Sequence, residues 1–228
     1  VVARESPDAF VACWDLEGPT FRHEAFAEYK AQREKKEDEL YAQIPLIQEG
    51  LALMGVPSHM VPGFEADDVI GTLARRAEAA GWDVVVLTGD RDLLQLVSDR
   101  ISVRLFRKGI SETDEVTPVT IQAQFGLTPE QIIEYKILRG DASDNIPGVK
   151  GIGEKGAKEL LAAYGTVQGA VEAAQDASSS MPARQRSALL EGRGDLAGLR
   201  SLVTIRTDVP VEYVLAPMEL DRTNENFL

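Results

Sequence analysis

The chain has 228 residues, and its content of 44% hydrophobic and 27% charged residues excludes a wholly disordered chain, a collagen-like repeat and a coiled coil. The 37 acidic and 24 basic residues give a net charge of −13, so the overall charge does not suggest a nucleic-acid binder. No apolar run approaches the roughly 20 residues of a membrane helix, and Cys13, as the single cysteine, excludes a disulfide within the chain and a multi-cysteine zinc site.

The first half of the sequence alternates predicted strands with predicted helices. We expect strands over residues 10–14, 56–61, 83–88 and 101–106. We expect helices over residues 24–54, with a break near Pro45, and over residues 66–80 and 91–97. This alternation predicts a mainly parallel sheet that is covered by helices on both faces.

The second half of the sequence predicts only helices and turns. The predicted helices cover residues 117–125, 129–138, 154–164 and 166–174, and further helix is expected to about residue 203. The serine-rich segment 176–187 is expected to be an exposed loop. We therefore expect an α/β domain over residues 1–116 and a helical domain over residues 117–228. The absence of an initiator Met and of a closing element suggests a fragment that was cut at both ends.

Acidic residues follow three predicted strands and one predicted helix. They are Asp15, Glu65, Asp67, Asp68, Asp90, Asp92, Asp141 and Asp144. Taken singly, each is explained by helix capping or by a turn. Because the carboxyl ends of parallel strands meet at one edge of a sheet, several of them would converge there and repel one another unless a cation lay between them. Oxygen ligands alone suit Mg²⁺ or Mn²⁺, and two such ions can promote phosphodiester cleavage.

A glycine-rich turn, Ile146–Gly153, precedes the predicted helix 154–164. Its glycines allow a close backbone approach, and Lys150, Lys155 and Lys158 add positive charge beside a helix N-terminus. This pattern is typical of a helix–hairpin–helix that grips a nucleic-acid backbone without reading bases. The alternative is an ordinary turn between two helices whose apolar residues belong to the core.

A basic stretch with an aromatic residue lies near the N-terminus. Tyr29, Lys30 and Arg33 follow Arg22 within it, and Lys35 and Lys36 come next. An aromatic ring beside cations can stack on an unpaired base while the cations contact phosphates. The alternative is a solvated helix face of mixed charge.

Four segments, residues 21–33, 63–68, 88–93 and 140–153, together resemble the 5′ nuclease domain of bacterial DNA polymerase I, within the flap endonuclease superfamily. The resemblance implies a PIN-like α/β fold with a C-terminal helix–hairpin–helix subdomain. It also implies hydrolysis of DNA near a 5′ end, flap or nick with two or more Mg²⁺ or Mn²⁺ ions. This sequence departs from the pattern of the family in two ways. No strand carrying a further metal-site Asp precedes Val1, and the prolines that usually follow at the position after Arg33 are missing.

The resemblance also implies roles for individual residues. The eight acidic residues would hold metal ions in two groups, Asp15, Glu65 and Asp67 in one, and Asp90, Asp92, Asp141 and Asp144 in the other. Lys30 and Arg22 would lie near the scissile phosphate. The residues that would bind DNA, with K⁺ assisting at the hairpin, are Tyr29, Arg33, Gly148, Val149, Lys150, Gly151, Ile152, Gly153 and Lys155.

The leading hypothesis is a structure-specific 5′ nuclease that acts in DNA replication and repair. We expect a cytoplasmic, nucleoid-associated bacterial protein without a membrane partner, which in its full length could be fused to a DNA polymerase. A non-catalytic DNA-binding module is the alternative that the missing N-terminal strand raises. A small-molecule phosphohydrolase is a third reading, but it does not explain the glycine-rich turn or the basic stretch.

Overall fold

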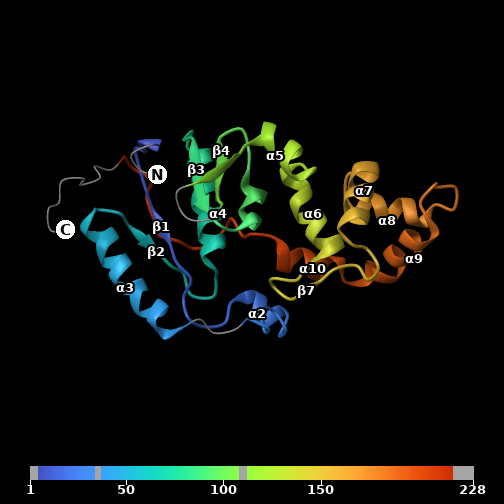
Figure 1. The fold of residues 1–228 in the computed structure, drawn as a ribbon, viewed down its shortest axis with the longest axis horizontal. Coiled ribbons are helices and arrows are strands. Elements are labelled where there is room, and N and C mark those ends of the chain that lie inside the picture. The colour runs from blue at the N-terminus through green and yellow to red at the C-terminus, as the bar shows by residue number, and fades with distance from the viewer. Residues whose placement is uncertain (1–4, 34–36, 108–111, 218–228) are drawn as a thin grey trace. The chain divides into compact units, whose positions relative to one another are not determined.

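The computed structural model describes residues 5–33, 37–107 and 112–217 (Figure 1). Lys35, Lys36 and the two ends of the chain lie outside the described residues. The chain forms two compact units, which we describe one at a time. The first comprises Val1–Thr20, Arg33–Leu73 and Arg206–Leu228, and the second comprises Phe21–Gln32 and Ala74–Ile205. The predicted division between residues 116 and 117 stays a prediction.

The first unit contains a pair of short parallel strands and one long helix. Its elements are β1 (Ala12–Cys13), β2 (Ser58–His59), α3 (Asp38–Leu53) and the first two turns of α4 (Ala66–Ala79). Both strands lie inside the predicted ranges 10–14 and 56–61 and are shorter, with Ala12 opposite Ser58 in the register. The apolar core of this unit comprises Val69, Leu73, Val209 and Val211, with Val11, Cys13, Val61, Phe64 and Tyr213 packed against them.

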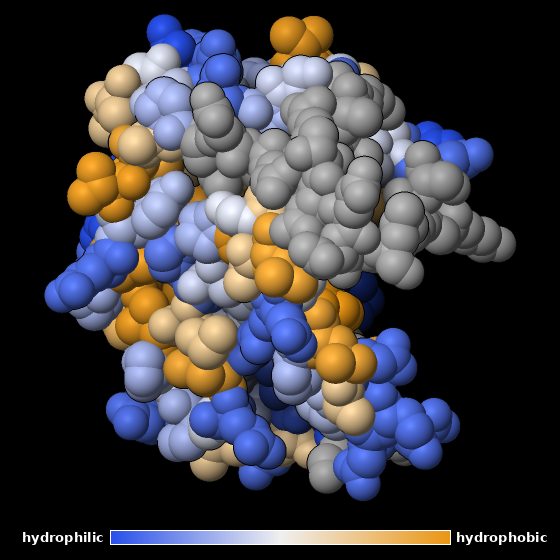
Figure 2. Space-filling model, turned by 90° about the vertical axis from the view of Figure 1, so that its left-hand side faces the viewer, coloured by the Kyte–Doolittle hydropathy of each residue, from blue (hydrophilic) through white to orange (hydrophobic). Residues whose placement is uncertain are grey.

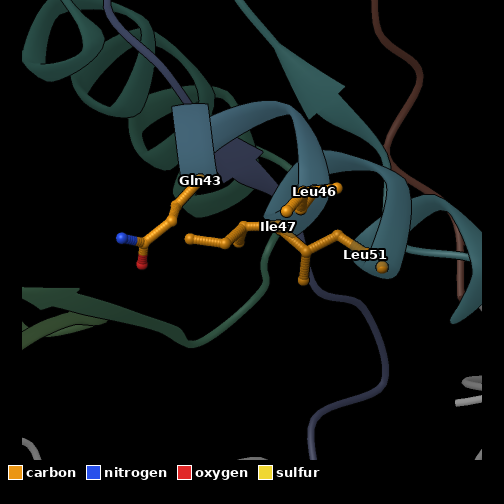
Figure 3. A pocket seen from close by; sticks show the side chains of 5 residues that line it. Gln43, Leu46, Ile47 and Leu51 are labelled. Atoms are coloured by element: carbon orange, nitrogen blue, oxygen red, sulfur yellow. The ribbon is translucent and has the colours of Figure 1, made fainter. Parts of the chain in front are cut away.

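Helix α3 contains no buried residue within the described part of the chain. The side chains of Leu46 and Ile47 are 66% and 51% exposed, and they border an open hollow of about 380 Å³ together with Gln43, Gly50 and Leu51 (Figure 3). Figure 2 shows the side of the molecule on which α3 lies in Figure 1, where hydrophobic residues reach the surface among hydrophilic ones.

The second unit contains a three-stranded sheet and most of the helices. Its elements are α2 (Phe21–Ala25), β3 (Val84–Thr88), the 3₁₀ helix η1 (Arg91–Leu96), β4 (Ile101–Phe106), β5 (Thr113–Val116), α5 (Pro118–Phe125), α6 (Pro129–Arg139), β6 (Gly140–Asp141), β7 (Ile146–Pro147), α7 (Glu154–Tyr164), α8 (Val167–Gln175), α9 (Ala183–Gly192), the 3₁₀ helix η2 (Arg193–Asp195) and α10 (Leu196–Val203). Within the described ranges, no helix is both long and apolar enough to span a lipid bilayer.

The sheet of the second unit contains the two segments rich in β-branched residues that are predicted as strands, β3 and β4. Strands β3 and β4 pair in parallel, as predicted, and β5, which is not among the predicted strands, adds an antiparallel edge. In β4, Ile101, Val103 and Leu105 are buried and alternate with half-buried residues, because successive side chains of a strand point to opposite faces. The predicted mainly parallel sheet is thus confirmed for β3 and β4.

The helices of the second half begin and end where local signals place them. The Thr117 side chain accepts a hydrogen bond from the Thr120 N–H at the start of α5, and Gly126 ends that helix in the left-handed region at φ +70°. The predicted helices α5, α6, α7 and α8 agree with the structure to within a residue at each end. Their burial builds a core from residues such as Ile137, Leu160 and Leu161, each 1% exposed.

Three expectations about secondary structure are wrong. Helix does not run through residues 24–54 with a break at Pro45, because Pro45 lies inside α3 and the interruption falls between α2 and α3. Residues 183–187 of the predicted loop belong to α9. The second half is not free of strands, since β6 and β7 form a short antiparallel pair.

Candidate metal centre

The loop between β6 and β7 carries two of the predicted acidic residues. Gly140 lies opposite Pro147 and Asp141 opposite Ile146 in this antiparallel pair. The backbones approach so closely that a Cβ on Gly148 would run into the backbone of Arg139 and Gly140. The tight crossing brings Asp141 and Asp144 to the same side of a short loop, and both are 8% exposed.

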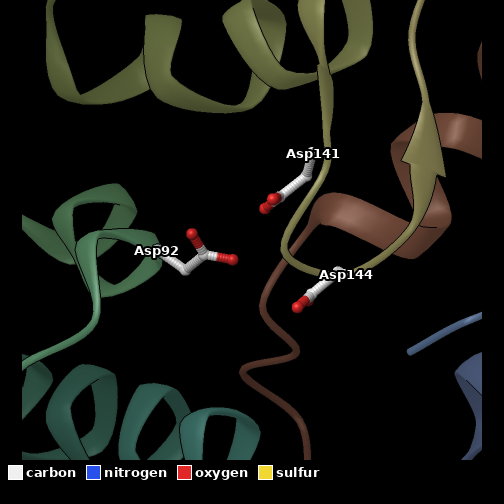
Figure 4. A group of neighbouring side chains, drawn as sticks. All are labelled: Asp92, Asp141 and Asp144. Carbon is white, nitrogen blue, oxygen red and sulfur yellow. The ribbon is translucent and has the colours of Figure 1, made fainter. Parts of the chain in front are cut away.

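Three carboxylates of the second unit lie close together (Figure 4). Asp92 from η1, Asp141 from β6 and Asp144 from the following loop each offer an oxygen, and these oxygens lie within 4.8 Å of one another. Figure 4 shows the three side chains directed toward a common space. Asp90 is exposed and caps η1, where its Oδ1 accepts a hydrogen bond of 2.8 Å from the Asp92 N–H. Three predicted ligands therefore meet, and the fourth caps the helix that carries one of them.

Lys136 of α6 extends into this cluster. Its ammonium donates to Oδ1 of Asp92 and, at 2.6 Å, to Oδ2 of Asp141. Burial raises the pKa of Asp92 to about 6, and the nearby charges of Asp90 and Asp141 add to the rise against the opposing Lys136. Burial alone would lower the pKa of Lys136, but the two carboxylates outweigh it and raise that pKa. Lys136 also outweighs the burial of Asp141 and lowers the pKa of that carboxyl to about 2.

The basic stretch near the N-terminus lies against the loop of Asp141 and Asp144. The Tyr29 hydroxyl donates to Oδ2 of Asp144, and the Lys30 N–H donates to the Asp144 carbonyl at 2.9 Å. Lys30 adopts a left-handed backbone at φ +54°, with its ammonium 3.9 Å from Asp144. The Gln32 amide donates to the Ala142 carbonyl at 2.9 Å. The stretch is therefore tied to the acidic loop, and Tyr29 is buried there at 2% exposure.

Arg22 has a different environment from Lys30. It is 3% exposed, and its guanidinium donates to the backbone carbonyls of Leu202 and Thr204 at the end of α10. These contacts support a role in fixing α2 to α10. The role of Arg22 near the scissile phosphate stays a prediction. Arg33 is exposed, and its contact with DNA also stays a prediction.

The first unit holds the remaining predicted ligands around the start of α4. Asp15 Oδ1 accepts a hydrogen bond of 2.7 Å from the Ala66 N–H, so an acidic residue at the end of β1 caps the helix. Asp68 is 0% exposed, and its two oxygens accept from the backbone N–H groups of Glu65 and Arg206. Asp67 is half-buried on the same turn. Within the described ranges, these residues do not form a three-carboxylate group as close as the one in the second unit.

Cys13 lies beside this group in the first unit. Burial raises the pKa of its thiol to about 12, with a further contribution from the charge of Asp67. The thiol is therefore protonated at neutral pH and is a poor nucleophile.

The glycine-rich turn separates core residues from exposed ones. Val149 and Ile152 are 4% and 5% exposed, so the apolar residues of the turn are part of the core. Lys150, Gly151 and Gly153 are exposed, with Gly151 at φ +92°. The Lys155 side chain, 91% exposed, extends from the first turn of α7. Contacts between this turn and DNA stay a prediction. The exposed residues of the turn are the ones that could make such contacts.

Lys136 and Ser143 belong to the site but are not among the residues predicted from the sequence. The Ser143 hydroxyl donates to Oδ1 of Asp141 at 2.5 Å, and its N–H donates to the same oxygen at 2.9 Å. A Ser two residues after an Asp is a known turn signal, so Ser143 could have been found. Lys136 sits in the last turn of α6, where a Lys is expected as a partner of the helix dipole, so no local signal marked it.

Comparison with known proteins adds to this geometry. Residues 1–126 match the model of the 5′-3′ exonuclease N-terminal resolvase-like domain, and residues 127–226 match that of the 5′-3′ exonuclease C-terminal SAM fold. The chain belongs to the 5′-3′ exonuclease family. Membership in this family confirms the predicted PIN-like α/β fold with a helical C-terminal part.

Curated relatives of this 5′-3′ exonuclease chain are DNA polymerases. The chain is 42% identical to DNA polymerase I of Bacillus caldotenax over 215 residues, which cover 94% of the chain and 24% of the relative. It is 43% identical to the thermostable DNA polymerase I of Thermus thermophilus over 209 residues, which cover 92% of the chain and 24% of the relative. The chain thus spans about a quarter of the length of the curated relatives it matches.

Solved structures share the fold of this 5′-3′ exonuclease chain. The T5 D15 protein co-crystallised with metal ions aligns with a TM-score of 0.72 at 22% identity, covering 90% of this chain and 78% of that one. The bacteriophage T5 flap endonuclease in a pseudo-enzyme-product complex with DNA and metal ions aligns with a TM-score of 0.69 at 23% identity, covering 90% and 76%. At these identities the alignments establish the fold.

Proposed function

We propose that this chain is a structure-specific 5′ nuclease, which hydrolyses DNA phosphodiesters at 5′ ends, flaps or nicks with divalent metal ions. The observation that carries the proposal is the meeting of Asp92, Asp141 and Asp144 in a chain of the 5′-3′ exonuclease family. The bacteriophage T5 relative in a complex with DNA and metal ions supports the same substrate and cofactor class.

The chemistry of the cluster fits a hard divalent cation. Three carboxylates offer oxygens within 4.8 Å of one another, and the described residues bring no His or Cys into that group. Oxygen-only ligands suit Mg²⁺ or Mn²⁺. The rise in the pKa of Asp92, which burial and the neighbouring carboxylates cause, indicates negative charge that a cation would relieve.

In the proposed mechanism, Asp92, Asp141 and Asp144 would hold one divalent ion, and Asp15, Glu65 and Asp67 would hold another. Such ions lower the pKa of a water and neutralise charge on the phosphate when they are bound.

Lys30 stabilises the charge that develops on the phosphate, because its ammonium lies beside Asp144. Asp68 and Asp90 support the site by capping α4 and η1.

The glycine-rich turn would hold the duplex away from the reacting phosphate. Its exposed Lys150, Gly151 and Gly153, followed by Lys155, offer a cation and backbone N–H groups to phosphates, with a K⁺ ion assisting at the turn. We further propose that the chain works in the bacterial cytoplasm at the nucleoid and is joined to a DNA polymerase, as in the relatives named DNA polymerase I.

Cleavage of a 5′-labelled flap duplex in the presence of Mg²⁺ tests this function. We expect Asp141→Asn to reduce the cleavage rate about 100-fold or more, because a group that stabilises transition-state charge is lost. Asp99→Asn, a change of the same charge at an exposed position of the second unit, should leave the rate unchanged. Cleavage that persists in EDTA would refute the metal mechanism, and flap binding by the unaltered protein without cleavage would support the DNA-binding module instead.

A further inference from the structure

Lys136 occupies the space between two carboxylates of the candidate metal centre. It comes from the last turn of α6, a helix that packs against η1, so its side chain points from one wall of the cluster toward Asp92 on the other. The Lys136 side chain is 12% exposed, and those of Asp92 and Asp141 are 21% and 11% exposed. The ammonium thus lies in a partly buried place where charges interact more strongly than in water.

The hydrogen bonds of Lys136 use oxygens that a divalent ion would need. Oδ2 of Asp141 accepts from Lys136, while Oδ1 of the same carboxylate accepts from the N–H and hydroxyl of Ser143. Both oxygens of Asp141 are therefore engaged. Oδ1 of Asp92 also accepts from Lys136. A divalent ion that binds Asp92 and Asp141 together has to share or take at least one oxygen that already accepts from the ammonium or from Ser143, and it meets the positive charge of Lys136 there.

We propose that Lys136 is an internal counter-cation, which holds Asp92 and Asp141 together in the metal-free protein and competes with a divalent ion for the same two carboxylates. This inference rests on the proposed function only in placing the ion at these carboxylates. A single positive charge stabilises the cluster partially, so the site is formed before the ion arrives. The divalent ion replaces that charge with two, and part of its binding free energy is used to displace the ammonium.

Titration of the protein with Mn²⁺, with the free ion measured by electron paramagnetic resonance, tests this competition. We expect Lys136→Met to bind Mn²⁺ about tenfold or more tightly, because the repelling charge is gone. Lys136→Arg keeps the cation and should bind Mn²⁺ as weakly as the unaltered protein. Arg107→Met, which removes an exposed cation that pairs with one carboxylate, Asp114, is the control and should leave the affinity unchanged.

A second readout uses thermal unfolding. Without metal, Lys136→Met should melt at a lower temperature than the unaltered protein, and Mn²⁺ should raise its melting temperature by a larger amount. Lys136→Gln, which keeps a hydrogen-bond donor, provides the same comparison if the Met variant does not fold. Asp92→Asn should lose the Mn²⁺ site in either background, which assigns the measured affinity to this cluster.

An unchanged or weaker Mn²⁺ affinity of Lys136→Met and Lys136→Gln would overturn the proposal, and so would the absence of Mn²⁺ binding in all variants. Flap cleavage is measured separately. A protein that does not cleave DNA but binds Mn²⁺ more tightly without Lys136 would refute the nuclease function and leave this inference standing. A protein that cleaves DNA with Mg²⁺, but whose Mn²⁺ affinity does not change when Lys136 is replaced, would support the nuclease function and refute this inference.

Discussion

The hydroxyl of Tyr29 donates a hydrogen bond of 3.0 Å to Oδ2 of Asp144, a residue 115 positions later in the chain. The adjacent Lys30 N–H donates to the carbonyl of the same Asp144. One candidate metal ligand is therefore oriented through both its side chain and its backbone by a segment near the N-terminus. The Tyr29 ring is 2% exposed in the structure, so the predicted contact of Tyr29 with DNA stays a prediction that requires this segment to move.

Tyr29→Phe should destabilise the second unit while keeping its packing. The ring remains, but a buried hydrogen bond to a charged acceptor is lost, which costs about 1.5–3 kcal/mol. Thermal or urea unfolding measures the loss. Tyr41→Phe on α3, where the ring is 46% exposed, should change stability by less than about 0.5 kcal/mol. Equal stability of the two variants would show that the Tyr29 hydroxyl does not hold Asp144.

Asp68→Ala should destabilise the first unit strongly. The substitution leaves the partly buried N–H groups of Glu65 and Arg206 without this acceptor, and each loss costs about 1 kcal/mol or more. Asp68→Asn keeps one acceptor oxygen and should cost less. Asp83→Ala removes an exposed carboxylate that pairs with Arg100, so its loss should stay below about 1 kcal/mol. Unfolding of Asp68→Ala at the same urea concentration as the unaltered protein would contradict the capping role.

Gly148→Ala should disrupt the loop that carries Asp141 and Asp144. A Cβ at this position would meet the backbone of Arg139 and Gly140, which cannot move aside as a flexible side chain could. We expect a loss of about 3 kcal/mol or more, at the upper end of over-packing, together with weaker Mn²⁺ binding. At Gly153 a Cβ would meet nothing within 4 Å, so Gly153→Ala should cost at most about 1 kcal/mol. Calorimetry distinguishes the two, and a stable Gly148→Ala would mean that the backbones separate readily.

His59 should make the first unit less stable at acidic pH. Its Nε2 is buried without a hydrogen-bond partner among the described residues, and burial lowers the pKa of the imidazole below its ordinary value. The unfolded chain therefore binds a proton near pH 6.5 while the folded chain does not, so this contribution to stability is present above pH 6.5 and is lost as the pH falls below it.

His59→Phe keeps an aromatic ring against Tyr213, whose centroid lies 4.6 Å from that of His59, and should reduce the acid sensitivity. Melting temperatures of both proteins between pH 7.5 and 5.5 measure the difference. Asp92, whose pKa is raised to about 6, contributes with the opposite sign in both proteins and cancels in that difference. Parallel pH curves for the two proteins would show that His59 does not titrate on unfolding.

The sequence by itself determined the elements that depend on neighbouring residues. Apolar periodicity located helices α5 to α8 and strands β3 and β4, because this signal acts within a few residues. The chemistry of the carboxylates also followed from residue types, which is why Asp92, Asp141 and Asp144 could be named as ligands before their positions were known.

Only the tertiary structure decided which groups meet and what each one does there. It gave Asp68, whose oxygens accept from backbone N–H groups, a different role from that of Asp92, which belongs to the carboxylate cluster. It also placed Lys136 beside Asp92 and Asp141, which are 44 and 5 residues away in the sequence. It also determined that the chain interrupts its helices around Lys30, held by Asp144, and continues through Pro45. Contacts between distant segments fix the interruption at Lys30 and the pairing of Lys136 with Asp92, because local propensity carries no information about residues that lie far away in the sequence.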